Sequence, residues 1–286
     1  MTDQMTVVVC APDNGFSHSS PDVQGLKDGL ADMLGSAAVK FCAVDEDGAA
    51  LSSELSRIRD NFDGDIVIVP TTPFADDMQK RLIPGVLSER KTEAGRTLLA
   101  RDAGVDPAML RAAQARVHEA LVGDVSAVVP QDSLLLIVGH GSIDTDANGN
   151  LMKMTRMIWE GLGFGWAEVA YVNGAFPLIE QSLARVGRLG FKSIVVLPYV
   201  IIGDHTVDGI PERVAKALDG AQSPQILYAR SLGAEENVIQ TLAERVREAV
   251  AGNAKSVMNC QLCTYREQVL AIEAHDHPHH DHAHDD

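Results

Sequence analysis

The chain has 286 residues and a formal net charge of −16 at pH 7, from 24 lysine and arginine residues against 40 aspartate and glutamate residues. Hydrophobic residues make up 45% of the chain and charged residues 22%, which is typical of globular proteins and excludes disordered and fibrous classes. The acidic excess argues against a nucleic-acid partner, because binding to phosphates requires clustered positive charge, and it suits a cationic partner such as a metal ion.

The sequence has no signal that predicts a membrane or secreted location. No run approaches the ~18 apolar residues of a membrane span, and residues 1–10 have no positively charged region before a short apolar run. We therefore expect a cytoplasmic protein without a membrane partner. In that reducing compartment its cysteines, Cys10, Cys42, Cys260 and Cys263, are expected to be free thiols or metal ligands.

Short apolar runs alternate with amphipathic stretches along the chain. The runs predict buried strands at residues 7–10, 39–44, 66–69, 134–138, 168–172 and 194–197. The amphipathic stretches predict helices, among them residues 151–162, 178–189 and 235–250. Nearly continuous apolar strands separated by helices indicate a parallel sheet covered on both faces, and hence an α/β fold.

The chain also repeats itself with an offset close to 128 residues. The matching segments are, in order, 7–13 with 135–141, 66–70 with 194–198, 83–84 with 210–211, and 98–104 with 227–233. Four matches in order predict two similar parallel-sheet α/β halves, residues 1–125 and 132–252. The remaining segment, residues 253–286, differs in character from both halves.

The end of this last segment is rich in histidine and aspartate. Residues 275–286 read HDHPHHDHAHDD and have no apolar residue larger than alanine or proline, which predicts a disordered tail. The histidines are expected to bind Co²⁺, Ni²⁺ or Zn²⁺, and they are His275, His277, His279, His280, His282 and His284. The interruptions favour a natural metal store or delivery arm over a purification tag.

A Cys-x-x-Cys pair precedes the tail, in the sequence Met258-x-Cys260-x-x-Cys263. Two thiolates at this spacing suit one metal ion or cluster, but they supply only half of a four-ligand site. A second pair would have to come from another chain. The alternatives are a redox dithiol and two inert cysteines in a linker.

Two histidines follow predicted strands of the second half. His140 stands between two glycines directly after the strand at 134–138, and His205 lies in the loop after the strand at 194–197. Ligands bind outside the carboxyl ends of strands in open α/β sheets, so both histidines are expected at one sheet edge. Two neutral imidazoles there could hold a divalent ion and accept protons. The repeat aligns His140 with Pro12 and His205 with Asp77, so we expect the chemistry in the second half alone.

Three segments around these histidines carry a family resemblance. They read LLIVGHGS at 135–142, TRMIWEGLGFGWAEVAYVNGAFPLIE at 155–180 and GFKSIVVLPYVIIGDHTVDGIPE at 190–212. They look like the CbiX-type sirohydrochlorin cobaltochelatases, which are type II chelatases related in fold to ferrochelatase. The resemblance implies that His140 and His205 form the active-site pair. It also implies insertion of Co²⁺ into sirohydrochlorin on the route to cobalamin.

The resemblance extends to the Cys-x-x-Cys pair. The chain also differs from the family pattern in two respects. Several long members are similar at Met258-x-Cys260-x-x-Cys263, which implies an iron–sulfur cluster there and a homodimer that bridges it. However, long members are expected to have their active histidines in the first half. Some members also have a carboxylate in the region of residues 171–177, where this chain has Asn173 and Phe176.

Further side chains near the histidines suit the same chemistry. Asp208 and Glu212 are candidates to orient an imidazole or pass protons outward, or they are simply acids at a helix start. Lys153 and Arg156 are candidates to bind the carboxylates of sirohydrochlorin, or they are solvated surface charges. Two other functions stay open: a non-catalytic cobalt-binding protein that hands metal to a separate chelatase, and the same insertion chemistry with Fe²⁺ or Ni²⁺.

Overall fold

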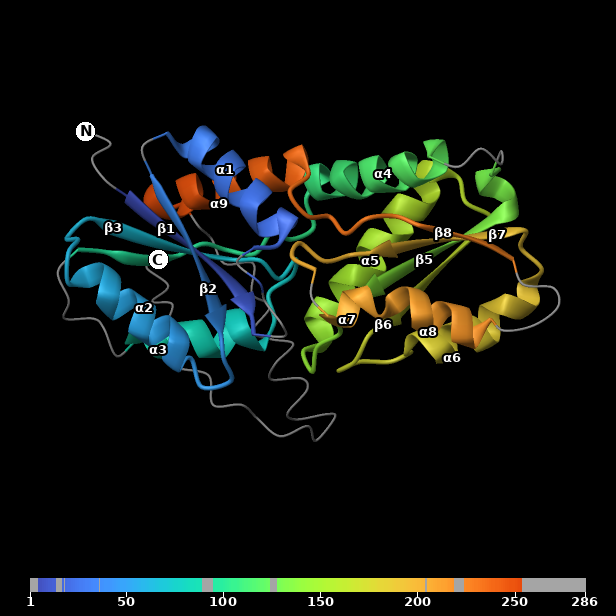
Figure 1. The fold of residues 1–286 in the computed structure, drawn as a ribbon, viewed down its shortest axis with the longest axis horizontal. Coiled ribbons are helices and arrows are strands. Elements are labelled where there is room, and N and C mark those ends of the chain that lie inside the picture. Colours follow the sequence, from blue (N-terminus) through green and yellow to red (C-terminus); the bar gives the residue numbers. More distant parts are fainter. Residues whose placement is uncertain are drawn as a thin grey trace, which may run out of the picture.

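The structure is a computed structural model that describes residues 5–13, 17, 19–35, 37–88, 95–123, 128–203, 205–218 and 224–253. Two four-stranded parallel sheets lie side by side, each with helices on both faces (Figure 1). This confirms the predicted α/β fold with two similar halves. The predicted tail lies outside the described residues.

The two sheets have the same strand order. The first, β2-β1-β3-β4, consists of β1 (Met5–Pro12), β2 (Ala38–Val44), β3 (Asp65–Pro70) and β4 (Thr97–Leu99). The second, β6-β5-β7-β8, consists of β5 (Ser133–Gly139), β6 (Trp166–Tyr171), β7 (Ser193–Pro198) and β8 (Gln225–Tyr228). The six predicted strands correspond to β1–β3 and β5–β7. The edge strands β4 and β8 are not predicted, because they are only 3 and 4 residues long.

Helices connect the strands and cover both sheets. They are α1 (Pro21–Leu34), α2 (Ala49–Arg59), α3 (Ile83–Ser88), α4 (Pro107–Val122), α5 (Thr145–Leu162), α6 (Ile179–Val186), α7 (His205–Asp208), α8 (Ile210–Ala217) and α9 (Glu236–Val250). A π-helical turn, η1 (Met78–Leu82), precedes α3, and 3-10 turns are found at η2 (Pro130–Asp132) and η3 (Gly187–Leu189). No described helix combines the length and the apolar character that crossing a membrane requires.

The internal repeat is visible in the pairing register. Thr6 of β1 lies opposite Ala38 of β2, and 128 residues further along Leu134 of β5 lies opposite Trp166 of β6. The backbone hydrogen bonds at the carboxyl ends of the central strands repeat as well. The backbone N–H of Thr71 donates to the carbonyl of Cys10 at 2.9 Å, and that of Tyr199 donates to Val138 at 2.8 Å. The duplication predicted from four sequence matches therefore holds in three dimensions.

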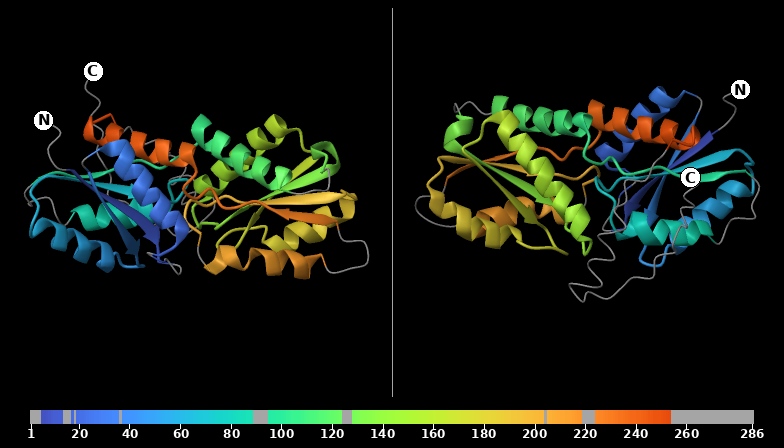
Figure 2. Two further views of the ribbon diagram at one scale, coloured as in Figure 1. Left: turned by 45° about the horizontal axis from the view of Figure 1, so that its top comes forward. Right: turned by 180° about the vertical axis from the view of Figure 1, so that it is seen from behind.

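The last helix of each sequence half packs on the other half. Helix α4 contacts α5, β7 and β8, whereas α9 contacts α1, β3 and β4. Figures 1 and 2 show α9 beside α1 and α4 beside α5. The division at residues 125–132 thus describes the sequence repeat. In space, α4 of the first half covers the second sheet, and α9 of the second half covers the first sheet.

Two buried arginines anchor the exchanged helices in matching ways. Arg116 of α4 donates to the carbonyl of Leu232, beyond β8, at 2.8 and 3.2 Å. Arg245 of α9 donates to the carbonyls of Asp102 and Ala103, beyond β4, at 3.0 and 2.9 Å. Each guanidinium therefore satisfies backbone acceptors of the half that its own helix covers.

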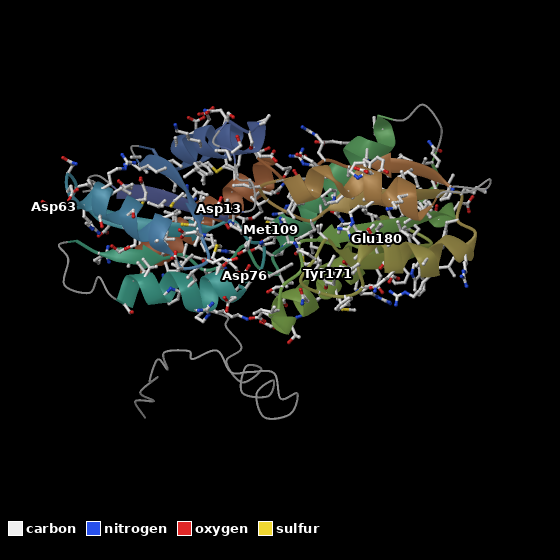
Figure 3. The ribbon with its side chains drawn as sticks, turned by 60° about the horizontal axis from the view of Figure 1, so that its bottom comes forward. Asp13, Asp63, Asp76, Met109, Tyr171 and Glu180 are labelled. Atoms are coloured by element: carbon white, nitrogen blue, oxygen red, sulfur yellow. The ribbon has the colours of Figure 1, made fainter. Side chains whose placement is uncertain are left out.

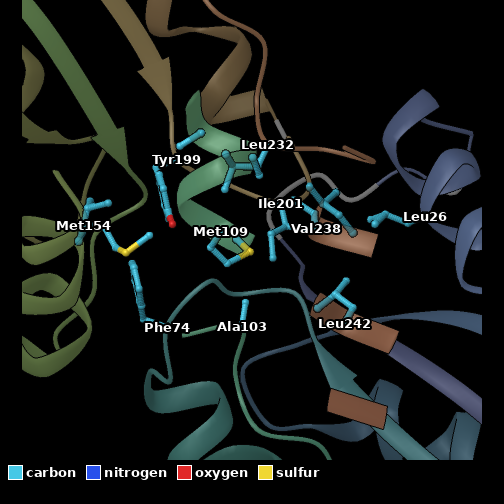
Figure 4. Close-up of a cluster of buried hydrophobic side chains, with 14 of the residues drawn as sticks. Leu26, Phe74, Ala103, Met109, Met154, Tyr199, Ile201, Leu232, Val238 and Leu242 are labelled. Carbon is cyan, nitrogen blue, oxygen red and sulfur yellow. The ribbon is translucent and has the colours of Figure 1, made fainter. Parts of the chain in front are cut away.

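A single apolar core runs through both halves. It includes Val67 of β3, Leu135 of β5, Met109 of α4 and Leu242 of α9, and Figure 4 shows side chains of both halves meeting around Met109. Two smaller clusters lie on the other faces of the sheets. One lies between the first sheet and helices α2 and α3, and the other lies between the second sheet and helices α6 and α8. Because the halves share a core, the strand ends at their junction have fixed relative positions.

Candidate active site between the two halves

A cavity of about 90 Å³ lies where the central strands of both sheets end. The first half contributes Ala11 and Pro12 of β1, residues 71–74 after β3, and Asp76. The second half contributes residues 139–142 after β5, residues 199–202 after β7, and the side chains of Ala147, Asn148, Leu151 and Tyr171. The carboxyl ends of the strands, where parallel α/β sheets bind ligands, thus meet at one cavity.

His140 lines this cavity directly after β5 and is half-buried. Its carbonyl accepts the backbone N–H of Asn173 at 3.0 Å. The next residue must be glycine, because Gly141 has φ +88° and a Cβ there would lie 1.9 Å from the Asn173 carbonyl oxygen. Asn148 of α5 closes the loop with bonds to the backbone N–H and carbonyl of Ser142, at 3.1 and 2.7 Å. The Gly-His-Gly sequence therefore fixes the backbone that presents His140.

The backbone of His205 lies in the loop that follows the neighbouring strand. β7 pairs with β5, residues 199–202 after β7 line the cavity, and His205 begins α7 three residues later. The two histidines thus leave adjacent strands at the same sheet edge, as the sequence predicts. The structure describes only the backbone at His205, so the pairing of the two imidazoles stays a prediction.

The other predicted contacts do not line the cavity. Asp208 at the end of α7 and Glu212 in the first turn of α8 are exposed. Lys153 and Arg156 lie on the exposed face of α5, where Arg156 donates to Glu160 at 2.7 Å. The structure therefore does not bring these four side chains to the cavity, and their roles toward protons and substrate remain untested.

The predicted thiol and histidine ligands of the last segment are not described. Cys260, Cys263 and the six tail histidines lie outside the described residues. Cys10 and Cys42 are buried free thiols on the paired strands β1 and β2, and burial raises the pKa of both thiols, that of Cys42 to about 11. Among the described side chains, which exclude that of His205, no three metal-binding residues converge.

The cavity wall also contains an acidic residue that is not among those predicted from the sequence, Asp76 of the first half. Burial is the main cause that raises the pKa of Asp76 to about 6, and the carboxylates of Asp77 and Asp144 add to it. The repeat offers a signal for this residue. An offset of 128 aligns residues 73–77 with 201–205, so the first half brings the corresponding loop to the same junction.

A buried ion pair joins the two halves next to this loop. Lys80 of η1 donates to Asp144 at 2.7 Å and to Asp146 at 3.3 Å, and its side chain is only 5% exposed. Asp144 also caps α5 by accepting the backbone N–H of Asp146 at 2.9 Å. This pair fixes the position of η1 relative to the start of α5, and hence of Asp76 relative to the His140 loop.

Tyr199 and Phe74 stack across the junction, one from each half. Their ring planes are parallel to within 1° with centroids 5.8 Å apart, and Figure 4 shows both beside Met109 and Met154. The Tyr199 hydroxyl is buried and has no hydrogen-bond partner among the described residues. Burial raises the pKa of Tyr199 far above its usual value, so the hydroxyl remains a donor at neutral pH.

Comparison with known proteins places the second half in a family. The sequence model of the CbiX family matches residues 134–249. A "Sirohydrochlorin cobaltochelatase" of Priestia megaterium is 27% identical over 208 residues, which are 72% of this chain and 67% of that relative. A "Sirohydrochlorin ferrochelatase" of the same organism is 26% identical over 117 residues, or 41% of this chain and 43% of that relative. The chain thus spans about two thirds of the cobaltochelatase and less than half of the ferrochelatase.

A solved structure has the same fold. SirB from Bacillus subtilis with Fe³⁺ superposes with a TM-score of 0.68 at 14% identity, over 88% of this chain and 99% of that one. At this identity the likeness concerns the fold, and the family assignment rests on the sequence matches. The CbiX segment contains β5 to β8, the His140 loop and α7. Residues 134–249 therefore form a CbiX domain, and the chain is similar in sequence to sirohydrochlorin chelatases.

Proposed function

We propose that this protein is a sirohydrochlorin cobaltochelatase, which inserts Co²⁺ into sirohydrochlorin during cobalamin biosynthesis. The observation that carries the proposal is the position of His140. It lines a cavity between the halves, at a strand end, within the segment that matches CbiX. We also propose that the protein acts in the cytoplasm and has no nucleic-acid or membrane partner.

Metal insertion exchanges two protons for one dication. Two pyrrole N–H bonds break, the electron pairs stay on the nitrogens and bind the metal ion, and the two protons pass to bases. In the proposal His140 and His205 first contact the incoming Co²⁺ through the free nitrogen of each neutral imidazole, and they accept protons at that nitrogen once the ion has passed to the macrocycle. Co²⁺ is a substrate in this reaction.

The cavity is too small to enclose the macrocycle. Its volume is about 90 Å³, whereas sirohydrochlorin has four linked rings and many carboxylates. The macrocycle therefore sits over the mouth of the cavity, with the metal and the leaving protons facing inward. Phe176, which is 77% exposed on the loop that bonds to the His140 backbone, offers an apolar surface to a ring.

The choice of Co²⁺ within the proposal has its own test. Imidazole affinity alone does not choose among Co²⁺, Fe²⁺ and Ni²⁺, because geometry and supply decide, and the relatives carry both cobalto- and ferrochelatase names. The test is insertion measured by absorbance under anaerobic conditions, with each metal at equal free concentration. We expect the highest kcat/KM for Co²⁺. A higher value for Fe²⁺ or Ni²⁺ would replace the cobalt assignment and keep the chelatase.

For the Cys-x-x-Cys pair we propose an iron–sulfur cluster shared by two chains. Cys260 and Cys263 supply two thiolates, and a homodimer would supply the four that a [2Fe–2S] or [4Fe–4S] cluster takes. Anaerobically purified protein should then be a dimer with visible absorbance and bound iron and sulfide. The variant with Cys260→Ser and Cys263→Ser should lose all three properties. A colourless wild-type protein would contradict the cluster.

For the histidine tail we propose metal storage or delivery. A chain that ends at Ala274 should bind fewer Co²⁺ ions, and its insertion rate should fall only when free Co²⁺ is scarce. At saturating Co²⁺ the rate should be nearly unchanged, because the proposal assigns the metal and proton transfer to His140 and His205. The measurement is insertion rate against free Co²⁺ for full-length and truncated protein. A lower maximal rate would mean that the tail takes part in the chemistry, and identical curves would exclude delivery.

A further inference from the structure

The part of the cavity wall that the first half contributes contains one acidic residue, Asp76. We propose that Asp76 accepts one of the two protons that sirohydrochlorin loses on metal insertion, so that the two halves form a single active site. This inference rests on the proposed chelatase function.

The position of Asp76 carries the inference. Asp76 lines the same cavity as His140, but it comes from the loop between β3 and η1. Figure 3 shows Asp76 on one side of the junction and Tyr171, which lines the cavity from the second half, on the other. The predicted proton carriers Asp208 and Glu212 are exposed and do not line the cavity. Among the described residues that line the cavity, Asp76 is the one with a carboxyl group.

The surroundings leave the Asp76 carboxylate able to take a proton. Its Oδ1 accepts the backbone N–H of Gln79 at 3.3 Å, and no ion pair to it is present among the described residues. The nearby ammonium group of Lys80 is held by Asp144 and Asp146 at 2.7 and 3.3 Å. A carboxylate without a cation is a better base than one in an ion pair.

Burial brings the pKa of Asp76 closer to the range in which a general base works best. Its pKa of about 6 lies much nearer to neutral pH than the usual 3.8, and general bases are most effective when their pKa is near the working pH. The titratable groups around it are Asp77 and Lys80 on its own segment, Asp102 on the loop after β4, Asp144 and Asp146 at the start of α5, and His140 in the cavity wall.

The proposed step balances with the groups at hand. One pyrrole N–H bond breaks, its proton passes to a carboxylate oxygen of Asp76, and the electron pair left on nitrogen binds the metal ion. The second proton passes to His140 or His205. The Tyr199 hydroxyl, buried in the wall of the same cavity, has no hydrogen-bond partner among the described residues, so it can donate to a polar group that enters the cavity.

The test compares Asp76→Asn, Asp76→Glu and the control Asp77→Asn. Asp77 is the adjacent acid, but it pairs with Arg81 at 2.8 Å and does not line the cavity. We expect Asp76→Asn to lower kcat about 10²-fold, the lower range for a general base, and Asp76→Glu to restore part of it. The wild-type rate should rise with pH through about 6 as Asp76 ionises, and Asp76→Asn should lose that component. Asp77→Asn should keep the rate at pH 7.5 and keep the pH-dependent component, moved slightly toward lower pH because the Asp77 carboxylate helps to raise the pKa of Asp76.

A second readout separates chemistry from folding. The pKa of Asp76 is higher in the folded than in the unfolded chain, so its ionisation lowers stability as pH rises from about 4 to 6, and the loss persists above 6. Asp76→Asn should therefore raise Tm at pH 7.5 and change it little at pH 4. Loss of rate together with a gain in Tm is not expected of a residue that merely maintains the structure.

The outcomes distinguish this inference from the proposed function. If wild-type protein inserts no metal into sirohydrochlorin, the proposed function fails. If the wild type inserts metal and Asp76→Asn does so with the same kcat and pH profile, the inference alone is wrong. A variant that loses activity together with Tm, or together with Co²⁺ binding, would make Asp76 a structural residue or a metal ligand and would also overturn it.

Discussion

Replacing His140 by alanine is expected to lower the rate of metal insertion about 10²-fold or more, which is the usual contribution of a positioned general base. The imidazole is half-buried in the cavity wall, while the loop is held by backbone bonds and by Asn148. The variant should therefore stay folded. The measurement is the anaerobic insertion rate, with circular dichroism to confirm the fold. His205→Ala should have a similar effect if the two imidazoles act together.

His118 provides the matched control for this experiment. It is an exposed histidine on α4 and does not line the cavity. His118→Ala should insert metal at the wild-type rate. Near-wild-type rates in both His140→Ala and His205→Ala would contradict the assignment of the site.

Replacing Arg245 by leucine is expected to lower the free energy of unfolding by about 5 kcal/mol, the upper range for breaking a buried ion pair. The Arg245 side chain is 2% exposed. It donates to the carboxylates of Asp106 at 2.7 Å and Glu248 at 3.1 Å, besides two backbone carbonyls beyond β4. Leucine would remove this donor from two backbone carbonyls and two carboxylates, and so weaken the attachment of α9 to the half that it covers.

Urea denaturation measures this effect, and Arg247→Leu on the same helix is its control. Arg247 is exposed and donates to the carbonyl of Met33, so its replacement should change stability by about 0.5 kcal/mol or less. Equal effects of the two variants would mean that the exchanged helix is not held by its buried arginine.

The sequence predicts the sheets well because their strands are buried on both faces. Runs such as residues 66–69 and 194–197 are continuously apolar, and the 128-residue offset relates one half to the other. The exchange of α4 and α9 is not predictable from this pattern. An amphipathic helix shows that it covers an apolar surface, but its sequence does not say which of two similar sheets provides that surface.

The candidate site is predictable only in part, for a related reason. His140 is recognisable because a strand, two glycines and a histidine occur together in one short segment. Asp76, Lys80 and Tyr199 acquire their roles from contacts between halves that are far apart in the sequence, such as the Lys80–Asp144 pair and the Phe74–Tyr199 stack. Burial then shifts the pKa of Asp76, and burial at a junction is not a property of local sequence.

The most direct test of the account is turnover by the wild-type protein. Anaerobic sirohydrochlorin and Co²⁺ are mixed with a catalytic amount of protein, far below the concentration of the macrocycle, and insertion is followed by absorbance against the uncatalysed rate. The account predicts many insertions per chain and a rate proportional to protein concentration. A non-catalytic cobalt-binding protein would bind Co²⁺ stoichiometrically and leave the insertion rate unchanged or lower, and that result would contradict the account.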